Sequence, residues 1–170
     1  MTLHTRLNTK GNSLIIVEKE LTAARAAWGD GILAISRAYD ADGITRARSV
    51  ANDVLDVAYG YDLGPVLFKP TLSGGEKTFR TTRKGALSYF VGHDPDYPLD
   101  LGFAIRGWRE TRSETAASFI DGSVAMWMGW MYFTDKDGQT IMTDKSWGYK
   151  KGDDGVLKIV LHHSSLPYQP

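Results

Sequence analysis

The chain has 170 residues, of which 42% are hydrophobic and 24% are charged, a composition typical of one globular domain with a sizeable core. Its 20 basic and 20 acidic residues give a net charge of zero, so we expect neither nucleic acid nor an anionic membrane surface as a partner. The absence of cysteine excludes disulfides, thiolate metal sites and cysteine nucleophiles.

The first 13 residues, MTLHTRLNTKGNS, contain no apolar segment of the kind that directs secretion, so we expect a cytoplasmic protein. We treat residues 1–13 as an N-terminal arm that precedes a single domain over residues 14–168. The most apolar run, residues 123–133, is too short to span a bilayer, and no membrane association is expected.

Two helices are predicted in the first third of the chain. Between Val17 and Tyr39, apolar residues recur at spacings of three and four, which places them on one helix face. Gly29 and Gly31 lie inside this pattern, and because each costs about 1 kcal/mol relative to alanine, we expect a kink there. A second helix with the same spacing follows over residues 44–58.

The rest of the chain has the pattern of strands, with one short helix. Residues 65–72 predict a short strand interrupted by Pro70, residues 82–91 predict a helix, and residues 93–102 predict a loop. Four strands follow, separated by turns that contain Asp-Gly pairs, and they cover residues 103–120, 123–133, 140–149 and 156–165. This order predicts an α+β fold with the helices packed on one face of a curved antiparallel sheet.

Both faces of the strand at 123–133 carry large apolar side chains. Alternate residues of a strand point to opposite faces. Met126, Met128, Trp130 and Tyr132 therefore share one face, and Ala125, Trp127, Gly129 and Met131 share the other. Such a strand is expected to be covered on both sides. Core packing explains most of the pattern, and a dimer interface or a pocket wall would explain the rest.

The chain has four histidines, two of which are adjacent near its C-terminal end. Because neighbours on a strand point to opposite faces, His162 and His163 cannot both bind one metal ion without a bulge. His4 lies in the arm, and a three-histidine zinc site would need His93 and a further distant ligand to converge. With no H-x-H or H-E-x-x-H spacing, the sequence predicts no metal and no cofactor.

The same alternation divides the residues of LHHSS between two faces. Leu161, His163 and Ser165 share one face, and His162 and Ser164 share the other. A histidine and a serine two residues apart suit two polar groups that line one pocket, and they equally suit the end of a buried strand. A serine hydrolase is not expected, because no G-x-S-x-G elbow is present.

Two helices, a short strand, a third helix and a long meander ending in a histidine-containing strand resemble the nuclear transport factor 2-like superfamily. That resemblance implies a cone-shaped half-barrel. The segments DKSWGYKKGDDG and VLKIVLHHSSLP are similar to the end of the association domain of calcium/calmodulin-dependent protein kinase II. Ser146 and His163 stand where that domain has pocket arginines, so its anion-binding pocket is not matched.

A closer resemblance, over most of residues 14–168, is to the iota-class carbonic anhydrases. It is carried by FKPTL, FRTT, GALSYFVG, DKSWGYKKGDDG and LHHSSLP. The branch with this pattern is understood to hydrate carbon dioxide without a metal. The resemblance implies a catalytic set of Thr71, Tyr89, His163 and Ser165, with Ser164 as the alternative if the register shifts by one residue.

The resemblance also implies a role for each side chain. The hydroxyls of Thr71 and Ser165 would hold water and bicarbonate, and Tyr89 would donate to the developing oxyanion. His163, with an ordinary pKa of about 6.5, would accept the proton. The expected substrate-binding residues are Ser164, Phe90, Trp147 and Met128. A homodimer is expected through the outer face of the sheet, at the Met-rich strand.

Two other functions stay open at this point. One is a non-catalytic oligomerisation or small-ligand-binding module of the kinase association-domain type. The other is a proton-shuttling isomerase on the same scaffold, which requires a carboxylate base inside the cone. Asp144 is the candidate for that base.

Overall fold

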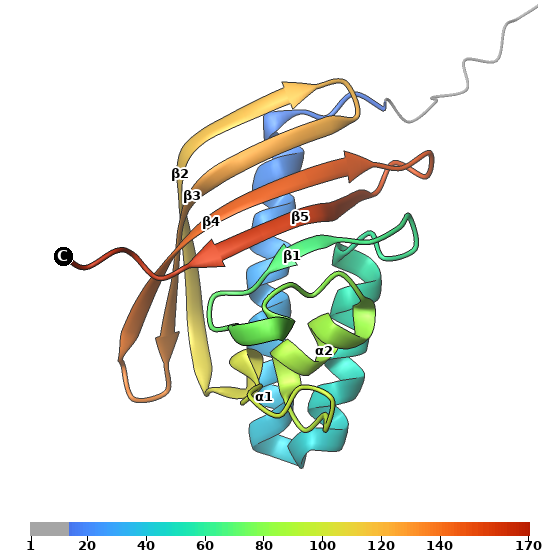
Figure 1. Ribbon diagram of the computed structural model, residues 1–170. Coiled ribbons are helices and arrows are strands. Elements are labelled where there is room, and N and C mark those ends of the chain that lie inside the picture. Colours follow the sequence, from blue (N-terminus) through green and yellow to red (C-terminus); the bar gives the residue numbers. More distant parts are fainter. Residues whose placement is uncertain (1–13) are drawn as a thin grey trace, which may run out of the picture.

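The computed structural model describes residues 14–170, and the predicted arm at 1–13, with His4, lies outside this part of the chain. Figure 1 shows two helical segments at the start of the described chain, the first (blue) laid against a curved sheet and the second (cyan) running back beside it, with a shorter helix next to them. In chain order, the elements are α1 (Glu18–Ala58), β1 (Leu67–Lys69), the 3₁₀ helix η1 (Gly75–Lys77), α2 (Arg83–Val91), the 3₁₀ helix η2 (Phe103–Ile105), β2 (Trp108–Asp121), β3 (Val124–Asp135), β4 (Thr140–Lys151) and β5 (Leu157–Ser165).

The two helices predicted in the first third are confirmed as the two segments of α1, which meet at a turn at Gly43 and pack against each other. This residue has φ 75° and ψ −165°, a conformation that favours glycine. The expected kink at Gly29 and Gly31 is therefore wrong. Those glycines allow close packing instead, because a Cβ at Gly29 would collide with Thr111 of β2 and a Cβ at Gly31 would lie 3.0 Å from Val54.

The five strands form one open, mixed sheet in the order β1-β5-β4-β3-β2. Strands β2 to β5 form the predicted antiparallel meander, and the glycine of each Asp-Gly pair has a positive φ. The short strand β1 pairs in parallel with β5, with Phe68 opposite His162, which corrects the expectation of a wholly antiparallel sheet. The strand predicted over residues 103–120 is shorter at its start, because residues 103–105 form η2 and β2 begins at Trp108.

The core lies between α1 and the sheet face that this helix covers, and α2 packs beside α1 (Figure 1). Strand β3 shows the division between faces, because Trp127 and Phe133 are buried whereas Met126 and Met128 are each 52% exposed. Core packing therefore explains the inner face, while the outer face of the single chain presents apolar side chains to solvent. None of the helices over residues 14–170 is both long and apolar enough to cross a bilayer.

Candidate active site

The last strand brings His162 and Ser164, and not His163 and Ser165, to the helix-covered face of the sheet. His162 is 1% exposed and Ser164 is fully buried, whereas His163 is exposed and Ser165 is half-buried. The expectation that His163 and Ser165 look into the cone is therefore wrong. The alternative register, with Ser164 inside, is the one that the chain adopts.

An irregularity in the pairing of β4 with β5 explains this reversal. Tyr149 pairs with Ile159 and Gly148 pairs with Leu161, so Val160 is an additional residue in β5. Strict alternation from the buried Ile159 would place Leu161 and each second residue after it inside. The bulge shifts this pattern by one residue, and the strand beyond it has the opposite orientation.

Ser164 stands at the centre of a buried group of hydroxyl and amine side chains. Its Oγ lies 2.6 Å from Oγ1 of Thr71, which follows β1 closely in the chain. The same Oγ accepts a hydrogen bond of 2.8 Å from Nζ of Lys145 on β4. Nζ of Lys69 donates to the backbone oxygen of Ser164 at 2.8 Å. The structure thus brings Thr71 to Ser164 and adds two lysines that the sequence analysis did not consider.

His162 continues this group toward the C-terminal end of α1. Its Nε2 lies 3.2 Å from Nζ of Lys145, and its Nδ1 lies 2.9 Å from the hydroxyl of Tyr59 at the end of α1. The Tyr59 hydroxyl accepts a hydrogen bond of 2.9 Å from Nε1 of Trp28. We use the name polar cluster for Trp28, Tyr59, Thr71, Lys145, His162 and Ser164.

Tyr89 of α2 lies beside Thr71. Burial raises the pKa of the Tyr89 hydroxyl to about 12, although Thr71 and Leu72 act to lower it. The hydroxyl is therefore protonated at neutral pH. Within residues 14–170 it has no well-directed hydrogen-bond partner, which leaves its proton available to a bound ligand.

The polar cluster contains two titratable groups whose charged forms are disfavoured by burial. Burial lowers the pKa of Lys145 to about 7, while Asp144 raises it and Lys69 lowers it. Burial also holds the pKa of His162 well below its usual value, and the neighbouring Lys145 and His163 add to that effect. At neutral pH, His162 is uncharged and Lys145 is divided between amine and ammonium.

Aromatic rings enclose His162. Phe68 stacks on its imidazole with ring centroids 4.5 Å apart, and Trp147 and Trp28 meet it at 5.2 Å and 5.6 Å with steeply inclined rings. Phe90 in turn stacks on Phe68 at 6.0 Å. Two of the expected wall residues, Phe90 and Trp147, are thus buried in the interior, where they exclude water and lower the local dielectric constant.

Tyr89 lines a cleft of about 490 Å³, although its hydroxyl oxygen is buried. Its rim is apolar, with Leu99 and Leu101 largely exposed, and Arg106 adds a positive charge. Leu72, the residue after Thr71, also lines it. The cleft therefore approaches the hydroxyl end of the polar cluster from outside.

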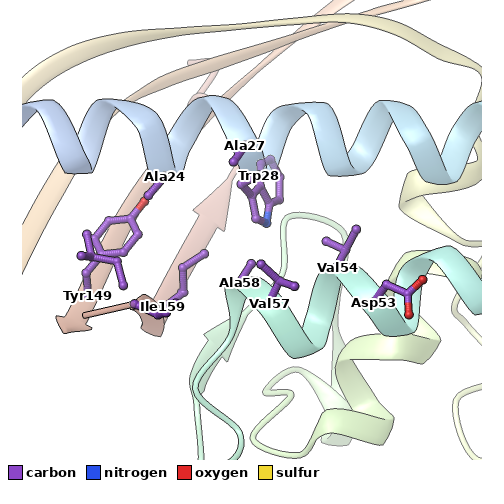
Figure 2. Close-up of a pocket in the computed structure, with 11 residues that line it drawn as sticks. Ala24, Ala27, Trp28, Asp53, Val54, Val57, Ala58, Tyr149 and Ile159 are labelled. Carbon is purple, nitrogen blue, oxygen red and sulfur yellow. The ribbon is translucent and has the colours of Figure 1, made fainter. Parts of the chain in front are cut away.

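A second pocket, of about 320 Å³, lies between the two halves of α1 and the strands β4 and β5 (Figure 2). Ala24 and Trp28 line it from the first half of α1, Val54 and Ala58 from the second, and Ile159 from β5. None of the predicted site residues lines this pocket. Its apolar lining offers little to polarise a substrate, so the candidate site is the polar cluster.

The outer face of the same two strands carries a separate polar group. Ser165 donates its backbone N–H to Asp144 at 3.1 Å and also donates its hydroxyl to that carboxylate. Asp144 therefore lies outside the cone, which removes the candidate base of an isomerase. Met128 lines a shallow outer pocket together with His163, so its expected place in the substrate slot is wrong.

No three histidine, aspartate or glutamate side chains in the described chain are grouped so that they could hold a metal ion. His93 is exposed, and its Nδ1 lies 2.9 Å from the backbone oxygen of Val91. His162 and His163 point to opposite faces, as strand alternation predicts.

Three members of the polar cluster were not predicted as site residues from the sequence, namely Lys145, Tyr59 and Trp28. Lys145 carries one usable signal, because it lies two residues before the buried Trp147 and a charged residue on a core face is uncommon. Its direct pairing with Ser164 depends on the register of β4 and β5. Tyr59 and Trp28 follow the helical apolar spacing, and only the tertiary fold brings them to His162.

The fold defines the class of protein first. A protein of Xanthomonas campestris assigned to the calcium/calmodulin dependent protein kinase II association domains superimposes with a TM-score of 0.56 and 19% identity over 89% of each chain. An NTF2-like protein of Pseudomonas putida KT2440 gives a TM-score of 0.54 and 12% identity, over 89% of this chain and 87% of that one. The predicted nuclear transport factor 2-like α+β fold is therefore confirmed.

More similar proteins define the family. The family of metal-independent carbonic anhydrases matches residues 19–166. A metal-independent carbonic anhydrase of Nostoc sp. (strain PCC 7120) is 52% identical over 154 residues, which are 91% of this chain and 75% of the relative. The crystal structure of an iota-carbonic anhydrase from a cyanobacterium, complexed with bicarbonate, superimposes with a TM-score of 0.94 and 50% identity, over 96% of this chain and all of that one.

The chain belongs to the metal-independent carbonic anhydrases. This confirms the predicted iota-class enzyme and its activity without a metal. It also favours that function over the non-catalytic association module, whose likeness to this chain extends to the fold alone.

Proposed function

We propose that the chain catalyses the reversible hydration of carbon dioxide to bicarbonate at Thr71 and Ser164, next to Tyr89. One observation carries the location: two hydroxyl oxygens 2.6 Å apart are buried beside a phenol that has no well-directed partner within residues 14–170. The ring of Tyr89 lines a cleft that opens to solvent. The bicarbonate in the cyanobacterial relative supports an anion of this chemistry as the ligand.

The reaction requires an oriented water, an apolar place for carbon dioxide and a donor for the charge that develops. Thr71 and Ser164 can hold the water, because each hydroxyl both donates and accepts. As the water oxygen bonds to the carbon of carbon dioxide, one electron pair of a C=O bond moves onto its oxygen. The protonated hydroxyl of Tyr89 donates to that oxygen, and the enclosed site strengthens this interaction.

The proton acceptor has to differ from the one implied by sequence resemblance. His163 lies on the outer face of the sheet, and His162 occupies the interior position. His162 is a weak base there, because burial lowers its pKa well below the usual value. Both of its ring nitrogens already face Tyr59 and Lys145, so in this proposal His162 positions its neighbours.

Stopped-flow measurement of carbon dioxide hydration by the chelator-treated chain tests this site. We expect the chelator to leave the rate unchanged, and Thr71→Ala and Tyr89→Phe each to lower kcat/KM by about 10²–10³-fold. Thr71→Ser keeps the hydroxyl and serves as the matched control. Wild-type rates in Thr71→Ala would exclude the site, and activity lost on chelation and restored by zinc or manganese would exclude the metal-free reaction.

We further propose that the chain forms a homodimer through the outer face of the sheet. Apolar side chains of two adjacent strands are exposed there, Phe119 at 61% and Met126 and Met128 at 52% each. Phe119 pairs with Met126, so these groups form one continuous surface that a second copy can cover symmetrically.

Sedimentation of the full chain tests the dimer. We expect Met128→Glu to convert the dimer to a monomer, because the interface would bury the new charge. Val57→Glu, which changes an equally apolar and exposed residue of α1, should leave the dimer intact. A monomeric wild-type chain at micromolar concentration, or a Met128→Glu chain that stays dimeric, would contradict the proposal.

A further inference from the structure

Lys145 is a buried amine with unusual partners. It is 4% exposed, and its Nζ lies 5.1 Å, 5.7 Å and 5.8 Å from the ring centres of Trp28, Phe133 and Trp147. Its hydrogen-bond partners are Ser164 and His162, and no carboxylate of residues 14–170 lies within ion-pair distance of it. A lysine enclosed without a counter-ion favours the neutral amine, because burial disfavours the charge.

The hydrogen bonds of the polar cluster require that Nζ of Lys145 accepts one of them, and only a neutral amine has the lone pair to do so. The indole N–H of Trp28 can only donate, so Tyr59 accepts it and directs its own proton to Nδ1 of His162. The imidazole proton then lies on Nε2, which faces Nζ of Lys145. An ammonium could not accept this N–H, so the fully paired arrangement contains a neutral Lys145 that donates to Ser164.

We propose that Lys145 accepts the proton that water loses during hydration, acting through the hydroxyl of Ser164; this rests on the site proposed above. Rotation about the Cε–Nζ bond turns the lone pair from His162 toward Ser164. As the water oxygen bonds to carbon dioxide, its O–H bond breaks and the proton passes to Oγ of Ser164, whose own hydroxyl proton moves to Nζ. The products are bicarbonate and an ammonium, which returns to the amine by losing its proton to solvent.

The charged groups around Lys145 set the pH at which this proton transfer operates. Burial lowers the pKa of Lys145 to about 7, Asp144 on the adjacent outer position of β4 raises it, and Lys69 of β1 lowers it. On the other sides, His162 of β5 has a pKa well below its usual value and Tyr59, the residue after α1, has one well above, so both are neutral near pH 7. The new ammonium would also stabilise the bicarbonate formed beside it.

The first test is the pH dependence of hydration by wild type and Lys145→Met, whose side chain has nearly the same length and does not titrate. We expect kcat/KM of the wild type to rise with pH through an apparent pKa of about 7. Lys145→Met should lose about 10²–10⁴-fold and lack this rise. A rise that persists unchanged in Lys145→Met would overturn the proposal.

Two neighbouring substitutions give a test that does not depend on Lys145→Met folding. Asp144→Asn removes a charge that raises the pKa of Lys145, so the rise in activity should move to lower pH. Lys69→Met removes a charge that lowers this pKa, so the rise should move to higher pH. Shifts of opposite sign are expected only if Lys145 titrates in the reaction, and shifts that are absent or reversed would contradict it.

An observation independent of activity completes the test. In the full chain with ¹³C-labelled lysine, one ε-carbon resonance should titrate near pH 7 and disappear in Lys145→Met. If Thr71→Ala abolishes activity but no such resonance exists, the site stands and Lys145 is not the acceptor. If Thr71→Ala keeps wild-type activity, the site itself is wrong whatever Lys145 does.

Discussion

Strands β4 and β5 carry two polar groups built from neighbouring residues, one on each face of the sheet. The inner group comprises Lys145, His162 and Ser164, and the outer group comprises Asp144, His163 and Ser165. Each group contains a histidine and a serine, with a lysine in the inner group and an aspartate in the outer one, but only the inner group is enclosed by aromatic rings and lies beside Thr71. Enclosure lowers the pKa of Lys145 and of His162 and gives the inner group its candidate role.

The largest effect of enclosure is expected at an ion pair near Tyr89. Arg80 and Asp100 are 3% and 2% exposed, and Asp100 also accepts a hydrogen bond from Ser88 of α2. Asp100→Asn would leave the Arg80 charge buried without a counter-ion, so we expect the free energy of unfolding to fall by about 3–5 kcal/mol. Urea unfolding of the two proteins at pH 7 measures this difference.

An ion pair on the exposed side provides the control for that prediction. Arg112 and Glu114 of β2 are both about half exposed, so water screens their attraction. Glu114→Gln should leave the urea midpoint of the chain unchanged. If Asp100→Asn and Glu114→Gln lowered the free energy of unfolding equally, enclosed and exposed ion pairs would not differ as we predict.

An effect of similar size, specific to the inner group, is the dependence of stability on pH. The pKa of Lys145 is about 7 in the folded chain, against 10.5 for an unperturbed lysine, so the folded state binds fewer protons than the unfolded state between these values. Lys145 therefore lowers the free energy of unfolding by its full amount below pH 7. This destabilisation decreases as the pH rises toward 10.5. We expect this term to amount to roughly 3–5 kcal/mol.

Comparison with Lys145→Met isolates this contribution, because the other titrating groups are common to both chains. The difference in unfolding free energy between wild type and Lys145→Met should move in favour of the wild type as the pH is raised from 7 to 10. Hydrogen bonds lost in the variant displace the difference by a constant and do not change this slope. A difference that is flat with pH would mean that Lys145 titrates as an exposed lysine does.

Much of the fold was predictable because its signals are local. The spacing of apolar residues predicts the helices, and the Asp-Gly pairs predict the turns of the meander. The additional kink expected at Gly29 and Gly31 is absent, because Gly29 packs against Thr111, a contact between distant parts of the chain. The break itself lies at Gly43, between the two predicted helices.

The site was predictable only in part, and for a definite physical reason. Thr71 and Tyr89 follow from family resemblance, but the choice between the two faces of β5 depends on the bulge at Val160. A bulge depends on the pairing of two strands and has no signal in a single strand. Lys145 was missed because its spacing from Trp147 is a weak signal of burial, and its role depends on the aromatic residues of α1 and β4 that surround it in the fold.

The most direct measurement compares carbon dioxide hydration by Ser164→Ala and Ser165→Ala. These adjacent serines differ in the face they occupy, and each substitution removes one hydroxyl from the chain. We expect Ser164→Ala to lower kcat/KM by at least about 10²-fold, because it removes both the water-holding oxygen and the link to Lys145. Ser165→Ala, which loses a bond to Asp144 on the outer face, should keep near wild-type activity. The opposite result, with Ser165→Ala inactive and Ser164→Ala active, would contradict a reaction inside the cone.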